Sequence, residues 1–188
     1  VRVKKRRNTM KKIFAMLLVA AMVLSMAACG KDDKKKEVSG DTPVQVLTTV
    51  WDGYADNQKF AISGGDWDNS VMDAPGEFDA ANAEALDSML GFPQDKVEAI
   101  DAAASFMHMM NANTFTAGAY HVKDAGDVDG VVSALKDNIK NRQWMCGFPD
   151  TLLIVKVDAN TVVSAFGEAT NIENFKTNIL AAYEGAEV

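Results

Sequence analysis

The side chain whose setting most clearly implies chemistry is Cys29. It follows Leu24-Ser25-Met26-Ala27-Ala28, an apolar stretch that ends in small residues, which is the pattern cleaved by lipoprotein signal peptidase. Residues 2–12 carry seven Lys and Arg and no acid, and residues 13–26 form an apolar run, as in an export signal. The run is shorter than the roughly 20 residues of a membrane-spanning helix. We therefore predict cleavage before Cys29, whose thiol then carries a thioether-linked lipid with fatty acids such as palmitate.

A second group of chemically capable side chains lies between Gly64 and Glu77. This segment is dense in turn residues and combines a tryptophan with several acids. Long irregular loops in compact domains are usually functional or disordered, and an indole ring among acids is costly to leave in water. We predict a ligand or partner loop here, with Asp66, Trp67, Asp68, Asp73 and Glu77 as its contact residues.

The same loop resembles a calcium-binding sequence in its spacing. Asp66, Asp68, Ser70 and Glu77 occupy the first, third, fifth and twelfth positions of such a loop. Val71 stands where the sharp turn requires glycine, however, and Pro75 interrupts the loop. A solvated surface loop is the favoured interpretation, and the sequence predicts neither a metal nor a cofactor.

Other reactive side chains have simpler explanations. Cys146 has no cysteine partner if Cys29 is lipidated, so it is either a small buried hydrophobe or a thiol tolerated by an anaerobe. Its surroundings, Trp144-Met145-Cys146-Gly147-Phe148-Pro149, lack the second cysteine of a redox motif. Methionines around His108 could form a soft Cu(I) site with Cys146, but helical spacing favours core packing for them. No nucleophile motif accompanies either histidine, so we do not expect an enzyme.

Charge and composition define three parts of the chain. Residues 1–28 form the signal peptide, with translation beginning at Val1 or Met10, and the polar residues 29–40 form a flexible tether. Removing residues 1–28 takes away seven of 19 basic residues and none of 26 acidic ones, leaving 12 against 26 and a net charge of −14. Such a charge excludes nucleic acid as a partner and favours a soluble surface. Residues 41–188 have the size of a single domain.

The hydrophobic pattern predicts an α+β fold for this domain. Three N-terminal helices are expected: from about Pro43 to Asp56 with Thr42 as its cap, from a cap at Asp79 to Gly91, and from Pro93 through Met107. Residues 59–63 are read as a short strand. The C-terminal half is expected to form strand, helix, strand, strand and helix. The elements are a strand at 114–123, a helix from a cap at Asp127 to about Trp144, a hairpin of strands 152–157 and 161–166 around Asp158-Ala159-Asn160, and a final helix through Tyr183. A right-handed crossover predicts a small antiparallel sheet in the order 1-3-2 with helices on one face.

Several short sequences along the chain carry a resemblance. They are Ala-Ala-Cys29-Gly30, Val71-Met72-Asp73-Ala74-Pro75-Gly76, Leu90-Gly91-Phe92-Pro93 and Arg142-Gln143-Trp144. In these the chain resembles a family of uncharacterised small lipoproteins of Gram-positive gut anaerobes, some of which are labelled bacteriocin transport accessory proteins. The resemblance implies a surface location and would make a lone thiol at Cys146 unremarkable.

These observations leave two functional hypotheses. The favoured one is a non-enzymatic binding or interaction module, held at the extracytoplasmic side of the cell membrane by lipid on Cys29, whose partner is a small ligand, a wall component or an envelope protein. The alternative is an accessory factor for export, such as bacteriocin transport, in which Cys146 or the acidic loop takes part.

Overall fold

The computed structural model describes residues 40–144 and 148–188, which belong to one compact unit with an α+β fold. Within these residues lie seven strands: β1 (Ile62–Gly64), β2 (Val71–Met72), β3 (Gly76–Phe78), β4 (Ile100–His108), β5 (Phe115–Val122), β6 (Thr151–Lys156) and β7 (Thr161–Gly167). They form one antiparallel sheet in the order β2-β1-β4-β5-β7-β6, and β3 pairs with β4 beside β1.

In the described part of the chain, four α-helices and three short 3₁₀ segments accompany the sheet. The α-helices are α2 (Pro43–Asp52), α3 (Ala83–Leu90), α4 (Val128–Asn141) and α5 (Ala169–Ala182); the 3₁₀ segments are η2 (Asp56–Gln58), η3 (Gln94–Ala99) and η4 (Ala125–Asp127). Among the described residues, no helix is both long and apolar enough to cross a membrane. The predicted lipidation site, Cys29, and the thiol of Cys146 lie outside the described residues.

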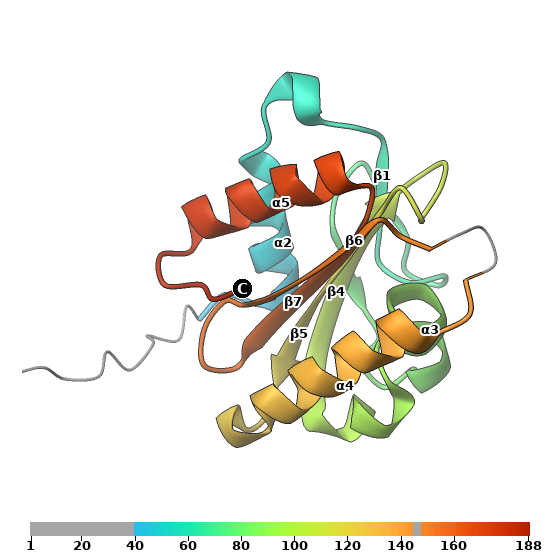
Figure 1. Ribbon diagram of the computed structural model, residues 1–188, viewed down its shortest axis with the longest axis vertical. Coiled ribbons are helices and arrows are strands. Elements are labelled where there is room, and N and C mark those ends of the chain that lie inside the picture. The colour runs from blue at the N-terminus through green and yellow to red at the C-terminus, as the bar shows by residue number, and fades with distance from the viewer. Residues whose placement is uncertain (1–39, 145–147) are drawn as a thin grey trace, which may run out of the picture. The chain divides into compact units, whose positions relative to one another are not determined.

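Helices cover both faces of the sheet (Figure 1). On one face, α2 and α5 pack their apolar stripes against alternate residues of the central strands, such as Phe106, Ala117 and Val163. On the other face, α3 and α4 pack against Ala103, Tyr120 and their neighbours. The prediction that helices lie on one face is therefore wrong. Central strands buried on both sides lose the alternation of polar and apolar residues that would mark an exposed face.

The largest error of the sequence prediction concerns residues 93–107. The sequence predicts a helix there, but the chain forms η3 and then the long central strand β4. Ala102, Ala103 and Ala104 favour a helix by propensity, yet β4 pairs with β1 and β3 on one side and with β5 on the other. Tertiary pairing overrides propensity here, and the small alanine side chains let the helices pack closely on the strand.

The predicted strand order describes only part of the sheet. The three strands expected in the order 1-3-2 correspond to β5, β6 and β7, which lie as β5-β7-β6. The complete order differs, because β4, β1, β2 and β3 extend the sheet beyond β5. β1 overlaps the short strand expected at residues 59–63. β2 and β3 have only two and three residues, too few for a hydrophobic alternation to be visible in the sequence.

Helix ends follow local capping rules with some corrections. Thr42 forms the predicted cap of α2, since its hydroxyl accepts from the Gln45 N–H and Gln45 Oε1 accepts from the Thr42 N–H. The cap of α3 is Asn82 and not Asp79, because Asn82 Oδ1 accepts from the Ala85 N–H at 3.0 Å. Asp127 makes no side-chain cap to α4, because η4 precedes it and Asp124 accepts the Gly126 N–H instead. Helices α2 and α4 also end earlier than predicted, at Asp52 and Asn141.

Candidate functional site

Asp66 organises the loop that follows β1. Its Oδ1 accepts hydrogen bonds from the backbone N–H groups of Asp68 (3.0 Å) and Asn69 (2.8 Å), and its Oδ2 accepts from the Asp79 N–H (2.9 Å). The Asn69 side-chain amide also donates to Oδ1 of Asp66 at 3.1 Å. The residue is only 5% exposed. Its carboxylate is thus a structural acceptor that ties the loop to the strand end beyond β3.

The electrostatics of Asp66 agree with this geometry. Burial by itself raises the pKa of the carboxyl group, but the N–H groups of Asp79, Asn69 and Asp68 and the Asn69 amide hold the pKa below its ordinary value. Hydrogen bonds to a charged form favour that form, so the carboxylate stays ionised and anchored.

The start of the loop is also fixed to the sheet. The hydroxyl of buried Ser105 on β4 donates to the Gly65 carbonyl at 2.9 Å, and the Gly65 N–H donates to the Ser105 carbonyl at 3.4 Å. A Cβ at Gly64 would overlap the backbone of Ala74 and Gly76, so the two ends of the loop approach as closely as glycine permits. The loop therefore has a rigid base.

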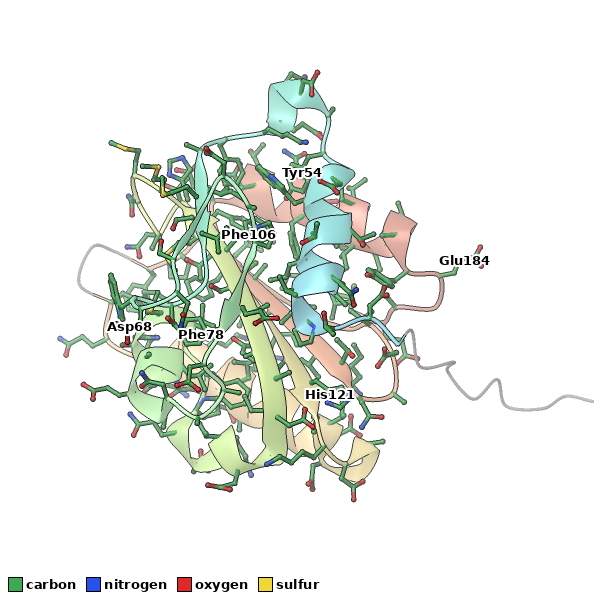
Figure 2. All side chains as sticks on the ribbon, turned by 180° about the vertical axis from the view of Figure 1, so that it is seen from behind. Tyr54, Asp68, Phe78, Phe106, His121 and Glu184 are labelled. Atoms are coloured by element: carbon green, nitrogen blue, oxygen red, sulfur yellow. The ribbon has the colours of Figure 1, made fainter. Side chains whose placement is uncertain are left out.

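The other predicted contact residues point outward from this base. Trp67 is 78% exposed, and Asp68, Asp73 and Glu77 are exposed as well; Asp68 is labelled at the surface in Figure 2. Asp73 has a left-handed backbone (φ 58°) in the turn between β2 and β3. No group of three His, Cys, Asp or Glu side chains that could hold a metal exists among the residues described by the structure. Asp66 is directed at backbone N–H groups, so the five predicted residues do not converge as a single set.

Trp67 instead borders a groove that the sequence analysis did not foresee. We call it the Trp67–Trp144 groove; it has a volume of about 270 Å³ and lies where β4 ends, β5 begins and β7 ends. Its lining is mixed apolar and polar: Trp67, Ser88, Met89, Met107, Ala112, Asn113, Thr116, Arg142, Gln143, Trp144 and Phe166. Ligand sites commonly combine apolar and aromatic walls with a few polar groups in this way.

The second tryptophan of the groove is held firmly in place. The Trp144 ring packs edge-on against Phe166 with centroids 5.1 Å apart, and its Nε1–H donates to the Ile139 carbonyl at 3.3 Å. The Arg142 guanidinium lies over the ring, 4.8 Å from its centroid. Trp144 is therefore oriented by three contacts before any ligand arrives.

Arg142 connects this wall to helix α3. Its guanidinium donates to the carbonyls of Asp87 (2.7 Å) and Ser88 (3.1 Å), which belong to the last turn of α3. A cation at a helix C-terminus satisfies carbonyls that lack intrahelical partners. Asn138 of α4 adds bonds to the Asp87 carboxylate and the Gly91 carbonyl, both at 2.9 Å.

The methionines and histidines are placed differently from the sequence expectation. Met107 is the next-to-last residue of β4 and lines the groove, whereas Met109 and Met110 are exposed in the turn that follows. The predicted helical core stripe is therefore wrong. His108 stacks on Phe60 with centroids 5.2 Å apart. His121 on β5 pairs with Asp101 on β4 at 2.6 Å, in an exposed position labelled in Figure 2. The Cu(I) alternative depends on Cys146, which lies outside the described residues.

The sequence does not mark Trp144 and Arg142 as site residues, because no recognised functional motif includes them. Trp67 and Trp144 are separated by the whole β4, β5 and α4 region, and only the sheet brings their walls together. The short run Arg142-Gln143-Trp144, two polar residues and an indole just after a helix, was the one available signal.

Comparison with known proteins adds no further information. No protein family model, no curated protein sequence and no solved structure matches this chain.

Proposed function

We propose that this chain is a lipid-anchored, non-enzymatic binding module at the extracytoplasmic side of the cell membrane, and that the Trp67–Trp144 groove is its ligand site. The observation that carries the proposal is the exposed indole of Trp67 on a loop with a fixed base. The Trp67 side chain is 78% exposed and therefore contributes little to folding stability. Tryptophan is enriched at surfaces where a protein binds another molecule.

The chemistry of the groove favours a sugar ring as the ligand. A hexose has C–H groups on its faces and hydroxyl groups around its edge. The exposed indole of Trp67 suits the former, and the polar groups of Asn113, Gln143 and Ser88 at the same groove suit the latter. Asp68, exposed next to Trp67, adds a carboxylate that accepts hydrogen bonds from hydroxyls. A glycan of the cell wall is therefore the ligand class that we propose.

Calorimetric titration of the domain with soluble wall oligosaccharides containing N-acetylglucosamine tests this function. We expect saturable binding that weakens by about tenfold or more in Trp67→Ala, the size of effect typical of a central aromatic contact. Met72→Ala is the matched control, because Met72 is also exposed and apolar but does not line the groove. Absence of binding by the intact domain, or equal binding by Trp67→Ala, contradicts the proposal.

A further inference from the structure

The outer edge of β6 is a second surface with unused binding capacity. β6 is the last strand of the sheet and pairs with β7 on one side. On its other side, the Lys156 N–H donates to the Glu187 carbonyl at 2.8 Å, and the Glu187 N–H donates to the Lys156 carbonyl at 2.9 Å. The chain itself thus shows that this edge accepts an antiparallel strand, although the pairing stops after a single bridge.

The rest of this edge offers the same backbone groups. In a strand, residues two apart direct their N–H and C=O groups to the same side, so those of Ile154 and Leu152 face the same edge as those of Lys156. Within residues 40–144 and 148–188, Glu187 is the only residue bridged to this edge. Unpaired edge groups of this kind form a template for an added strand.

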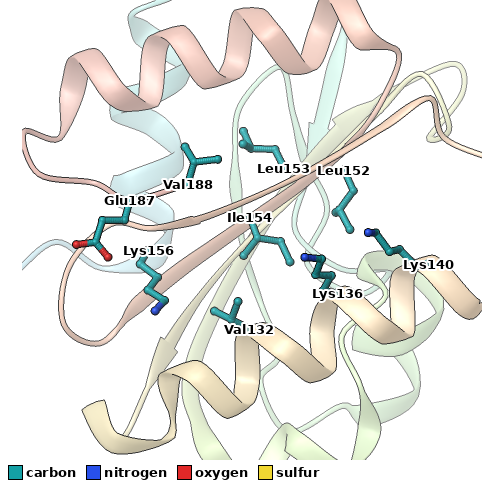
Figure 3. Close-up of a pocket in the computed structure, with 9 residues that line it drawn as sticks. All are labelled: Val132, Lys136, Lys140, Leu152, Leu153, Ile154, Lys156, Glu187 and Val188. Carbon is teal, nitrogen blue, oxygen red and sulfur yellow. The ribbon is translucent and has the colours of Figure 1, made fainter.

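A groove of about 450 Å³ runs along the edge (Figure 3). Leu152 and Ile154 point toward α4, where Val132, Lys136 and Lys140 line the groove, and Leu153 points toward α5 on the other face (Figure 3). An added strand would alternate between these two environments. Its side chains on the α4 face would meet the two lysines, and those on the α5 face would meet Leu153.

The charges of the groove define its occupant. Lys136 and Lys140 are exposed on α4, and the described part of the chain shows an ion pair for neither of them. They form a cationic patch in a groove whose lining holds one acid, Glu187, and whose third lysine, Lys156, is paired with Asp129. In the sequence as a whole, acids outnumber bases. Acidic side chains on an incoming strand would therefore match this patch, whereas basic ones would be repelled.

A second copy of the chain fits this edge less well. Antiparallel pairing of β6 with β6 of another copy would follow a two-fold axis perpendicular to the sheet and place both α4 helices on the same face. The lysines of the two copies would then meet across the seam, and two domains of high negative charge would be brought together.

We propose that the β6 edge captures an extended acidic segment of a partner protein by strand addition, with acidic residues facing Lys136 and Lys140 and apolar residues on alternate positions facing α5. Main-chain hydrogen bonds to Leu152 and Ile154 supply affinity, and the alternating side chains supply specificity. The two grooves share no lining residue, so each proposal is tested with its own variants.

Fluorescence anisotropy with a labelled eight-residue peptide that alternates valine and glutamate tests the proposal. We expect saturable binding to the domain and about tenfold weaker binding of the valine–lysine peptide. The double variant Lys136→Glu with Lys140→Glu should bind the acidic peptide about tenfold more weakly. Lys59→Glu with Lys123→Glu is the matched control, because it changes net charge equally at exposed lysines that do not line the groove.

Ile154→Pro separates strand addition from simple charge attraction. Because the Ile154 N–H faces the open edge, proline there removes no hydrogen bond to β7 and is tolerated as on other edge strands. We expect this variant to remain folded by circular dichroism and to lose peptide binding. Unchanged binding by Ile154→Pro, no binding by the unaltered domain, or a dimer in sedimentation that Ile154→Pro dissociates would each overturn the proposal.

Discussion

Asp66 and Trp67 are neighbours in the sequence with opposite environments. The carboxylate of Asp66 turns inward to four donors, while the indole of Trp67 turns outward to solvent. Asp66 therefore fixes the conformation of the loop, and the loop holds the Trp67 side chain in solvent.

Replacing Asp66 should weaken the fold. Asp66→Asn keeps the side-chain shape but turns one acceptor oxygen into an N–H donor that opposes a backbone N–H. We expect a loss of about 2 kcal/mol in the free energy of unfolding, as for a buried charge-assisted acceptor, measured by urea denaturation at pH 7. Asp68→Asn, at an exposed position, should change stability by less than about 0.5 kcal/mol. Equal effects of the two substitutions would contradict the structural role of Asp66.

The lowered pKa of Asp66 also sets the direction of a pH effect. The unfolded carboxyl group titrates near pH 4. Above that pH the contribution of Asp66 to stability is fully present, and it is lost as the pH falls through the lower folded-state pKa. The stability of the unaltered domain should therefore decline more steeply than that of Asp66→Asn below about pH 4, in denaturation series at several pH values.

Trp67 should be nearly dispensable for folding. Trp67→Ala removes a side chain that is 78% exposed, so the free energy of unfolding should change by less than about 0.5 kcal/mol. Trp51→Ala is the contrasting variant, because Trp51 is 7% exposed among Tyr54, Phe60 and Phe106, and it should lose about 3 kcal/mol or more. A large loss in Trp67→Ala would mean that its ring packs on the domain and is not available to a ligand.

Among the elements, the predictions were most accurate where a periodic apolar pattern was flanked by a capping or turn residue. The helix that begins at Pro43 after Thr42, the end of α3 at Gly91 with φ 67°, and the hairpin at Asp158 all follow local rules. Asp158 Oδ1 accepts from the N–H groups of Asn160 and Thr161 and so closes that turn.

The prediction failed where partners distant in sequence decide the structure. β4 has the composition of a helix and becomes a strand because β1, β3 and β5 pair with it. For the same reason, the loop with Trp67 was predicted but its opposite wall was not. Trp144 reaches the groove only because α4 packs across the sheet and ends there.

The contact between α3 and the segment after α4 yields a prediction for these elements. Arg142→Ala removes two hydrogen bonds to the last turn of α3 and the cation above Trp144. We expect a loss of about 1–2 kcal/mol in the free energy of unfolding. Arg142→Lys should recover only part of it, because an ammonium group cannot match the planar fork that serves both carbonyls. Full recovery by lysine would show that charge alone suffices.

At the scale of the whole molecule, the two proposed sites lie on different elements of one sheet. The Trp67–Trp144 groove lies at the ends of β4 and β7 and the start of β5, whereas the second groove runs along the outer edge of β6. A module with this layout could hold a wall glycan and a protein segment at the same time.

Attachment of the whole protein to the membrane is the remaining prediction. The net charge of −14 that cleavage before Cys29 would leave repels an anionic lipid surface. We therefore expect lipid on Cys29 to hold the protein at the membrane, since buried acyl chains contribute about 0.8 kcal/mol per methylene. In Cys29→Ala we expect loss of labelling by a palmitate analogue and release from the membrane fraction, whereas Cys146→Ala should keep both. Unchanged labelling and membrane retention of Cys29→Ala would exclude lipidation at this residue.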